Sequence, residues 1–462
     1  MRLRRIVVIG VVVSTVAGLA AVQLTGWADT SAPAGPTPVR SVGVQLPVTD
    51  FRAIELDEDR GRLYLAQGVD GGLPLVVTDL DGKLLRRVDA VTDISDLVLS
   101  DDHRTLLVAQ GFARVVALDA QTLTPTATYE APDGACVYLV EPTGDKIVGG
   151  YRDCGIGSGG LLVWSAPGTA PVVYTGGPDY RPVIDASAGA PGLLVAGDTG
   201  VSPVTTYVID VSGASPRIVA RRDDTGGNLQ DYAVSPDGTQ VVESVGSPYE
   251  HRSYTLPDLG DSTVYPSGVY PADAAWSGDG STVAIARAFT FSDDPDVLLY
   301  RKDSTVPYYA VDFRSGDDLW KGTVLVSRDG SRAWAVSYND VYQEVQLLHS
   351  FGPGHPPNPP VTDLAVSAHT GTGKNKRTAY YTVTWSSPMT GNLANSVNDY
   401  YWWITASTNG GPEQEIWRGR MDSSGTYSGT YSLPKGTTTL TVRFKDFEDW
   451  YPPGYDTATL TF

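Results

Sequence analysis

Short runs of apolar residues, separated by turns rich in Asp, Pro and Gly, make up most of the first 350 residues. Runs of this kind are typical of β-strands joined by tight turns. In one stretch the pattern predicts four successive strands, at residues 231–235, 240–245, 251–256 and 262–265. Outside the N-terminal segment, no part of the chain has the periodicity of a long amphipathic helix. The pattern therefore predicts an all-β protein.

One turn signal recurs seven times, for example as Ser235-Pro236-Asp237-Gly238 and Ser277-Gly278-Asp279-Gly280. The equivalent positions are 61, 103, 144, 192, 238, 280 and 330. They are separated by roughly 45 residues, a period that with four strands per unit is typical of β-propellers. Each unit is a small sheet, or blade, that buries its faces by stacking on its neighbours. We therefore expect a seven-bladed β-propeller over residues 40–351.

The last repeat unit lacks a strand. Its pattern predicts strands at residues 323–327, 332–338 and 342–351, after which a run of Gly and Pro ends the unit. At the other end of the repeat, residues 40–48 form a strand-like segment that precedes the first unit. We expect this segment to supply the missing outer strand of the seventh blade and so to close the ring.

A second, smaller domain follows the repeat. Residues 352–360 form a Pro-rich linker, and seven short strands can be placed within residues 361–462. Seven strands in about 100 residues is the pattern of a β-sandwich. The Pro-rich entry and Val383-Thr384-Trp385 on the second strand resemble a fibronectin type III domain, or an immunoglobulin-like relative without its disulfide. Such domains are spacers or adhesive modules.

The repeat also resembles a known group of proteins. The Ser-Pro-Asp-Gly turn followed by Val241-Val242, and the segment at residues 115–122, are similar to secreted bacterial propellers of the YVTN and WD-repeat-like type. The resemblance covers residues 40–351. It implies the fold and leaves the function open, because this fold is shared by enzymes, adhesins and scaffolds.

The N-terminus has the features of a secretory signal peptide. Arg2, Arg4 and Arg5 precede an apolar stretch at residues 6–22, and Gly26-Trp27-Ala28 supplies a cleavage site. We expect residues 1–28 to be removed, residues 29–39 to be a flexible segment, and the protein to be secreted. The alternative is an uncleaved N-terminal membrane anchor. No other stretch is long and apolar enough to span a bilayer, so no membrane span is expected after cleavage.

The charge and the cysteine content limit the classes of ligand that we expect the chain to bind. The net charge is −19, so the chain repels phosphate backbones and nucleic-acid binding is not expected. The two cysteines, Cys136 and Cys154, do not have a zinc-site spacing, and a secreted chain permits them to form a disulfide.

Four carboxylates occupy one position of the repeat. Asp96, Asp185, Asp231 and Asp273 each stand seven residues before a turn position, where the other three units have Ile54, Val137 and Thr323. We expect these aspartates around one mouth of the central channel, where calcium or magnesium could be held. The alternative is that each aspartate caps its own turn through local backbone hydrogen bonds. No other cofactor is expected.

The same mouth should carry a rim of aromatic and charged side chains suited to binding a glycan or a peptide. The rim residues are Tyr151, Arg152, Tyr180, Arg181, Tyr249, His251, Tyr270, Phe289, Phe291, Trp320 and Tyr338. The alternative is that these are isolated surface aromatics without a shared role. Both cysteines are expected on this face.

Catalytic motifs are mostly missing. There is no Gly-x-Ser-x-Gly element, and the histidines form no metal-ligand pattern, so His251 is the sole candidate for a general base. We therefore predict a non-catalytic binding or scaffold protein that recognises a glycan or a protein or peptide at the cell surface. The alternatives are a divalent-metal-dependent, lactonase-like hydrolase or lyase, and a structural subunit of a surface assembly.

Overall fold

The structure is a computed structural model that describes most of the chain between residues 35 and 461. The described ranges are 35–41, 43–68, 72–155, 157–288, 294–313, 317–339, 342–357, 362–370, 378–386, 401–420, 425–432, 438–445 and 457–461. The predicted signal peptide lies outside these residues. Within them, no helix has the length and apolar character needed to cross a membrane.

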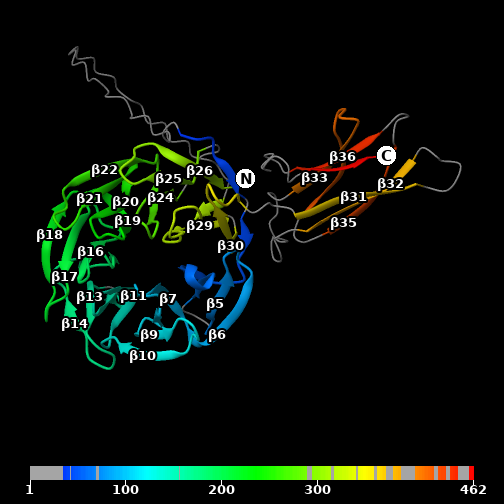
Figure 1. Ribbon diagram of the computed structural model, residues 1–462. Helices are drawn as coiled ribbons and strands as arrows, with labels where there is room; N and C mark the ends of the chain where they lie inside the picture. Colours follow the sequence, from blue (N-terminus) through cyan, green and yellow to red (C-terminus); the bar gives the residue numbers. More distant parts are fainter. Residues whose placement is uncertain are drawn as a thin grey trace, which may run out of the picture. The chain divides into compact units, whose positions relative to one another are not determined.

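Antiparallel sheets follow one another along the chain, and we number them one to seven (Figure 1). Sheet one contains β3 (Phe51–Asp57), β4 (Arg62–Gln67), β5 (Pro74–Asp79) and β6 (Leu84–Thr92), with the short 3-10 helix η1 (Glu58–Arg60) after β3. Sheet two contains β7 (Ile94–Leu99), β8 (Thr105–Gln110), β9 (Arg114–Asp119) and β10 (Pro125–Glu130). Sheet three contains β11 (Ala135–Thr143), β12 (Lys146–Asp153), β13 (Gly159–Trp164) and β14 (Val172–Tyr174).

Sheets four to six have the same order of strands, and sheet seven differs. Sheet four contains β15 (Pro182–Ala186), β16 (Leu193–Asp198), β17 (Thr205–Asp210) and β18 (Arg217–Asp223). Sheet five contains β19 (Gly227–Val234), β20 (Gln240–Ser247), β21 (Glu250–Thr255) and β22 (Asp261–Pro266). Sheet six contains β23 (Pro271–Trp276), β24 (Thr282–Arg287), β25 (Val297–Arg301) and β26 (Pro307–Phe313). Sheet seven contains β27 (Asp317–Leu319), β28 (Leu325–Val326), β29 (Ala333–Asn339) and β30 (Tyr342–Phe351). It differs because β27 and β28 both pair with β29.

The hydrophobic core is divided among the junctions between neighbouring sheets. Sheets one and two share a buried cluster that includes Tyr64, Leu75, Ile94 and Leu106. Similar clusters join each later pair of sheets, from two and three up to six and seven. A further cluster joins sheet seven to sheet one, so the series returns to its start and forms a ring (Figure 1). Each sheet thus buries both faces against its neighbours, which a single small sheet could not do alone.

The seven turn positions identified in the sequence share one backbone conformation. All of them have a positive φ: Gly61, His103, Gly144, Gly192, Gly238, Gly280 and Gly330. Only glycine adopts this left-handed region without a steric penalty, so His103 is the one strained member of the set. At Gly238 a side chain would also be blocked, because an added Cβ would lie 2.6 Å from the Cβ of Ala190 in sheet four.

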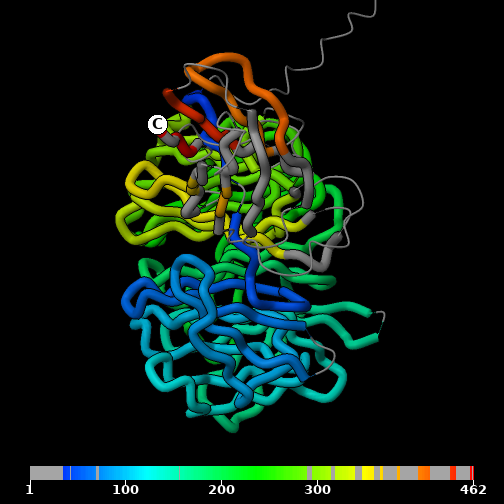
Figure 2. Tube along the Cα trace, turned by 90° about the vertical axis from the view of Figure 1, so that its right-hand side faces the viewer, coloured from blue at the N-terminus to red at the C-terminus, as the bar shows by residue number. Residues whose placement is uncertain are grey.

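The N-terminal segment closes the ring, and it does so in two steps. β1 (Val39–Ser41) pairs in parallel with β26 of sheet six, and β2 (Val44–Gln45) pairs antiparallel with β30 of sheet seven. Figure 2 shows this segment in dark blue, running beside the later strands toward sheet one. The outer strand predicted for the last unit is therefore present as β2. The pairing of β1 with sheet six was not foreseen.

Ser41 strengthens this closure through a buried histidine. Its Oγ lies 2.8 Å from Nδ1 of His349 on β30, and Nε2 of the same ring lies 2.8 Å from Oγ of Ser337. The ring of Phe313, from β26, stacks on the imidazole at 3.9 Å between centroids. The N-terminal segment is therefore tied to sheets six and seven by side chains as well as by backbone pairing.

Two further sheets lie in the C-terminal part of the chain. One contains β31 (Thr362–Thr370), β32 (Thr378–Ser386) and β35 (Gly425–Ser432). The other contains β34 (Gln414–Arg420), β33 (Tyr401–Thr408), β36 (Thr439–Lys445) and β37 (Thr457–Thr461). Ile404, Ala406, Leu440 and Val442 are fully buried. All seven strands that the sequence pattern predicts after the linker are present.

Candidate functional site

The innermost strands of the ring surround a central channel of about 490 Å³. These are the first strands of sheets one to six, completed by β28 of sheet seven. Several of them contain a β-bulge at the same place, for example between Ile94 and Asp96 in β7 and between Leu229 and Asp231 in β19. A bulge redirects the side chain that follows it. The bulge therefore accounts for the position of Asp96, Asp231 and Asp273 at the channel.

Six of the first seven sheets each contribute one carboxylate to the channel wall from their innermost strand. They are Glu55, Asp96, Glu141, Asp185, Asp231 and Asp273, from sheets one to six in that order. Most accept a hydrogen bond from a backbone N–H on the innermost strand of the next sheet. Asp96 accepts from Val140 at 2.8 Å, and Asp273 accepts from Thr323 at 2.6 Å and from Val324 at 3.0 Å.

Three more of these carboxylates also accept a backbone N–H from the innermost strand of the next sheet. Glu55 accepts from the N–H of Leu99, Asp185 from that of Val234, and Asp231 from that of Ala274. An innermost strand is a sheet edge, so its outward N–H groups lack a strand partner. The carboxylates satisfy these groups and link each sheet to the next. The alternative, that each aspartate caps its own turn, does not account for these hydrogen bonds, because their acceptor and donor belong to different sheets.

Burial raises the pKa of every carboxylate in the channel wall. The pKa rises to about 8 for Glu55, to about 7 for Asp96 and Asp185, and to about 6 for Asp273. The pKa of Asp231 is raised well above its usual value by burial and then by the charges of Asp273 and Asp185. That of Glu141 is raised by burial and by the charges of Asp185 and Asp96. Glu55, Asp96 and Asp185 therefore hold protons for part or most of the time at neutral pH.

The channel carboxylates were only partly predicted. The four aspartates line the channel, but Glu55 and Glu141 were missed. The fixed distance from the turn fails in these two sheets because their turns differ in length. β11 continues to Thr143 and the next strand starts at Lys146, whereas β7 ends at Leu99 and the next strand starts at Thr105. Among the described residues, no three or more His, Cys, Asp or Glu side chains come close enough together to hold a metal ion.

A separate pocket opens on the face where the connections between sheets emerge, which we call the mouth face. It has a volume of about 470 Å³ and lies between sheets five, six and seven. Its lining residues are Asn228, Gln230, Gly246, Tyr270, Pro271, Ala288 and Lys321. This volume lies in the range of small-molecule sites, and the mixture of apolar and polar groups is typical of them.

Two predicted rim residues meet beside this pocket. Tyr249 and Tyr270 are 43% and 39% exposed, and their rings contact edge to face at 5.8 Å between centroids. Tyr270 has a φ of 60°, and Asn228, another lining residue, also has a φ of 60°. A bulky residue in the left-handed region is strained, and such strain is concentrated at functional sites.

Lys321 supplies the positive charge of the pocket. It lies in the connection that leads into β28, and its Nζ donates to Oε1 of Gln230. The surrounding protein lowers the pKa of Lys321 by desolvation. The sequence alone did not indicate Lys321, Asn228 or Gln230. Lys321 lies in a connection without a motif, and Asn228 and Gln230 lie at the start of β19, before the predicted strand at residues 231–235.

The predicted rim residues do not form one continuous site. His251 is fully buried, with Nδ1 at 2.9 Å from Oγ of Ser267 and Nε2 at 3.1 Å from the carbonyl oxygen of Asp273. Burial lowers the pKa of His251 to about 3. This overturns its placement at the mouth, because a neutral ring enclosed by the protein cannot reach a ligand there as a general base.

Three more rim residues are packed against the protein. The ring of Trp320 contacts those of Phe51 at 5.5 Å and Tyr338 at 5.4 Å. Tyr151 packs on the cluster that joins sheets two and three. Phe289 and Phe291 lie outside the described residues. Tyr180, Arg181 and Arg152 remain on the mouth face, where Cys136 and Cys154 form a disulfide with a Cα–Cα distance of 5.0 Å.

Comparison with known proteins identifies the architecture of the ring. The β-propeller domain of Cps50 (Swd1) from Myceliophteria thermophila superposes with a TM-score of 0.50 and 14% sequence identity. The superposition covers 67% of this chain and 98% of that domain. The chain has a β-propeller fold. At this identity the likeness shows the fold alone. No protein-family model and no curated protein sequence matches the chain.

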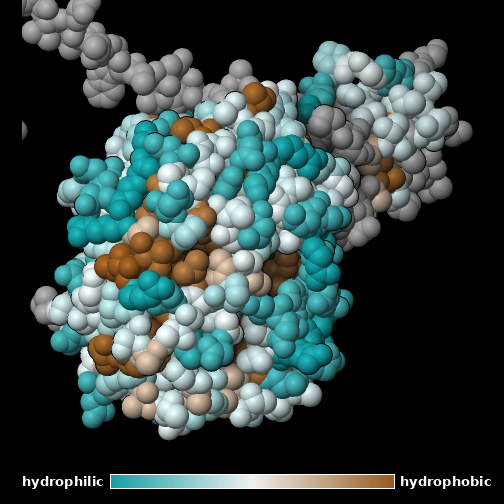
Figure 3. All heavy atoms as spheres, turned by 60° about the vertical axis from the view of Figure 1, so that its left-hand side comes forward, coloured by the Kyte–Doolittle hydropathy of each residue, from teal (hydrophilic) through white to brown (hydrophobic). Residues whose placement is uncertain are grey.

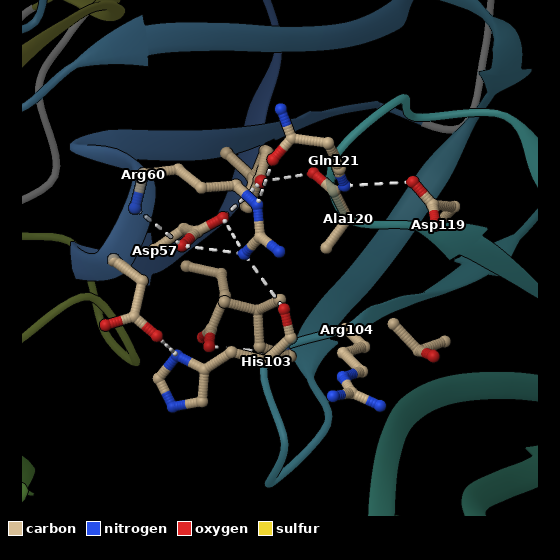
Figure 4. A network of polar contacts seen from close by, with 12 residues as sticks. Asp57, Arg60, His103, Arg104, Asp119, Ala120 and Gln121 are labelled. Atoms are coloured by element: carbon tan, nitrogen blue, oxygen red, sulfur yellow. Dashed lines mark hydrogen bonds and ion pairs between the residues drawn. The ribbon is translucent and has the colours of Figure 1, made fainter.

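The face of the propeller opposite the mouth is held by polar contacts between sheets. Figure 4 shows Arg60 at the centre of one such network. Its Nη1 donates to the Asp57 carboxylate at 3.0 Å and to the His103 carbonyl oxygen at 2.9 Å, and its Nε donates to Gln121 at 3.1 Å. Sheets one and two are thus linked at their turns. The contacts of Arg60 join the two sheets, so we place no site here.

The outer strands of the propeller carry exposed apolar side chains. Val172 and Val173 on β14 and Ile218 and Val219 on β18 are each more than a third exposed. Figure 3, which brings this side forward, shows apolar patches among polar surroundings. Scattered apolar groups are normal on protein surfaces.

Proposed function

We propose that this protein is a secreted, non-catalytic binding or scaffold protein whose mouth face recognises a glycan or a peptide. The observation that carries this proposal is the pocket of about 470 Å³ between sheets five, six and seven. It combines an exposed tyrosine, apolar Pro271 and Ala288, and the amide and ammonium groups of Gln230 and Lys321. Such a lining can hold a ligand without performing chemistry on it.

We also infer the organisation around this pocket. The seven sheets are the seven blades of one propeller, because each has its own turn signal and its own junction with the next. The two C-terminal sheets form a fibronectin type III or immunoglobulin-like sandwich that spaces or anchors the propeller. The apolar N-terminal segment directs the chain out of the cell. The acidic channel holds the blades together, while the pocket binds the partner.

Tyr270 provides the sharpest test of the proposed pocket. Its φ of 60° suits glycine, so Tyr270→Gly removes the ring and relieves backbone strain at once. We expect this variant to retain or gain stability, by up to about 1 kcal/mol, and to bind at least about tenfold more weakly. Ligands would first be found on glycan and peptide arrays, and the affinity for the best one would be measured by calorimetry.

His103→Gly is the matched control. His103 has a φ of 56° and lies on the opposite face, so the same backbone change is made away from the pocket. We expect its affinity to equal that of the wild type. Equal affinities for Tyr270→Gly and the wild type, or failure of the arrays to yield any glycan or peptide, would contradict the proposed function.

A further inference from the structure

A second group of side chains on the mouth face surrounds Tyr138, in sheets two to four. The guanidinium carbon of Arg152 lies 4.8 Å from the centroid of the Tyr138 ring, and that of Arg181 lies 5.6 Å from it. Nε of Arg152 also donates to the Tyr138 hydroxyl. The ring of Phe112 contacts that of Tyr138 at 4.9 Å. We call these four residues the arginine–tyrosine cluster.

Arg181 is held in place by a backbone clamp. The carboxylate of Asp198 accepts the N–H groups of Asp179, Tyr180 and Arg181 at 2.9, 3.0 and 3.1 Å. The N–H of Thr199 donates to the carbonyl oxygen of Arg181 at 3.0 Å. These contacts fix the backbone from which the guanidinium extends, so little conformational entropy remains to be lost there when a ligand binds.

Arg152 and Tyr138 are fixed from the other side. The disulfide between Cys136 and Cys154 joins β11, which carries Tyr138, to the residue that follows β12, which carries Arg152. Tyr138 lies at the bulge between Val137 and Leu139, and the N–H of Val137 donates to the carbonyl oxygen of Phe112 at 2.9 Å. Phe112 itself has a φ of 59°. A strained aromatic residue and a disulfide thus support the same two side chains.

The two arginines of the cluster lack acidic partners. Among the described residues, no carboxylate lies within ion-pair distance of either guanidinium, although the chain carries 53 acidic residues against 34 basic ones. Arg221 and Arg222 also lie over tyrosine rings, those of Tyr207 and Tyr254, but they pair with Asp223 at 2.8 Å and with Asp261 at 2.6 Å. Two like charges beside one ring leave a positive site on an acidic protein.

We propose that the arginine–tyrosine cluster is a carboxylate-binding subsite of the mouth face and that its ligand is an acidic glycan bearing uronic acid residues. This proposal rests on the proposed function and specifies the ligand. A guanidinium is planar and binds a carboxylate through two parallel hydrogen bonds. Tyr180, which is 50% exposed and adjacent to Arg181, offers an amphipathic surface for the sugar ring. A hexuronate residue carries both the charge and the ring in one unit.

Calorimetric titration with a short oligogalacturonate, and with its methyl ester as the uncharged counterpart, tests this proposal. We expect the acid to bind and the ester to bind at least about tenfold more weakly. Arg152→Gln and Arg181→Gln should each weaken binding of the acid about tenfold, as expected for losing one charge-assisted hydrogen bond. Arg181→Lys should lose part of this affinity, because it keeps the charge without the two parallel donors. Added salt should weaken binding of the acid.

Arg221→Gln is the matched control, because it removes an arginine over a tyrosine that already has a carboxylate partner. We expect its affinity for oligogalacturonate to equal that of the wild type, and thermal unfolding would show that all variants are folded. Equal binding of acid and ester, unchanged by the arginine variants, would overturn the carboxylate subsite while leaving the proposed function intact. Arginine-dependent binding of poly-glutamate without binding of the glycan would overturn the choice of ligand. Failure of all glycans and peptides would overturn the proposed function itself.

Discussion

Replacing Asp273 by Asn tests whether the channel carboxylates serve as hydrogen-bond acceptors or as negative charges. Asp273 is 2% exposed, and its Oδ2 accepts two backbone N–H groups, from Thr323 and Val324 of sheet seven. The amide oxygen of Asn can accept the same two groups, but the side chain cannot ionise. The substitution therefore keeps the link between sheets six and seven and removes one buried charge.

The size of the effect follows from the pKa of Asp273. Burial raises this pKa from 3.8 to about 6. An acid of this kind stabilises the fold fully below its unfolded pKa, and that contribution is lost as the pH rises through the folded pKa. Since one pKa unit corresponds to about 1.4 kcal/mol, ionising Asp273 costs the folded protein about 3 kcal/mol. Roughly half of this cost arises between pH 5 and pH 8.

Urea unfolding followed by tryptophan fluorescence at pH 5 and pH 8 measures this difference. We expect the free energy of unfolding of Asp273→Asn, relative to the wild type, to rise by about 1 to 2 kcal/mol between the two pH values. The buried histidines titrate in both proteins, so their contribution to the pH dependence cancels when the variant is compared with the wild type. Asp273→Ala leaves two buried N–H groups without an acceptor, so we expect it to lose about 2 to 5 kcal/mol at both pH values.

A fall with pH, in place of a rise, in the unfolding free energy of Asp273→Asn relative to the wild type would refute this reasoning. If the channel held a cation, the negative charge would be needed at neutral pH, and Asp273→Asn would become less stable than the wild type as the pH rises. The experiment therefore separates an acceptor that links two blades from a ligand of calcium or magnesium, without requiring that the metal be identified beforehand.

Three further outcomes are expected. In urea unfolding, Gly238→Ala should destabilise the protein by about 1 to 3 kcal/mol more than Gly61→Ala. Both positions have a positive φ, but only Gly238 faces Ala190 at close range. Equal losses of unfolding free energy in the two variants would contradict this. Removing residues 35–45 should lower the thermal unfolding temperature by several degrees, since the two closing strands are lost. An unchanged temperature in calorimetry would show that the ring closes without them. Burial lowers the pKa of His349 to about 3, so the stability that the neutral ring gives above pH 6.5 should be lost as the pH falls. Between pH 7 and pH 5 the free energy of unfolding of His349→Gln should therefore fall by about 2 kcal/mol less than that of the wild type. An equal fall in both proteins would argue against a neutral buried ring.

The parts of this structure that sequence predicts well are those determined locally. A turn such as Ser235-Pro236-Asp237-Gly238 needs a left-handed residue at its end, and the backbone there is left-handed at Gly238. The backbone is also left-handed at His103, where the turn has no glycine. This position could still be predicted, because it follows from the period of the repeat. The strands on either side follow from the alternation of apolar residues. Even the closing strand β2 could be predicted, because the last unit lacked one.

The parts that the sequence does not predict depend on contacts between sheets. Nothing near Asp96 indicates that its carboxylate accepts the N–H of Val140, which lies in another sheet. His251 looks like a free imidazole in the sequence, yet Ser267 and the backbone of Asp273 enclose it. The offset that identified four aspartates failed for Glu141 because a shorter turn shifts the position of the strand relative to its marker.

These errors have a common cause that bears on function. In the sequence, four regularly spaced aspartates attract more attention than any other polar group, yet regular spacing in a propeller is what a structural contact repeated in each blade requires. The groups that break the repeat are better candidates for binding: Tyr270 and Lys321 beside the pocket, and Arg152 and Arg181 over Tyr138. Each of these occurs in a single sheet. A ligand that is not symmetric must be recognised by residues that do not follow the symmetry of the fold, so the search for the partner should begin at these positions.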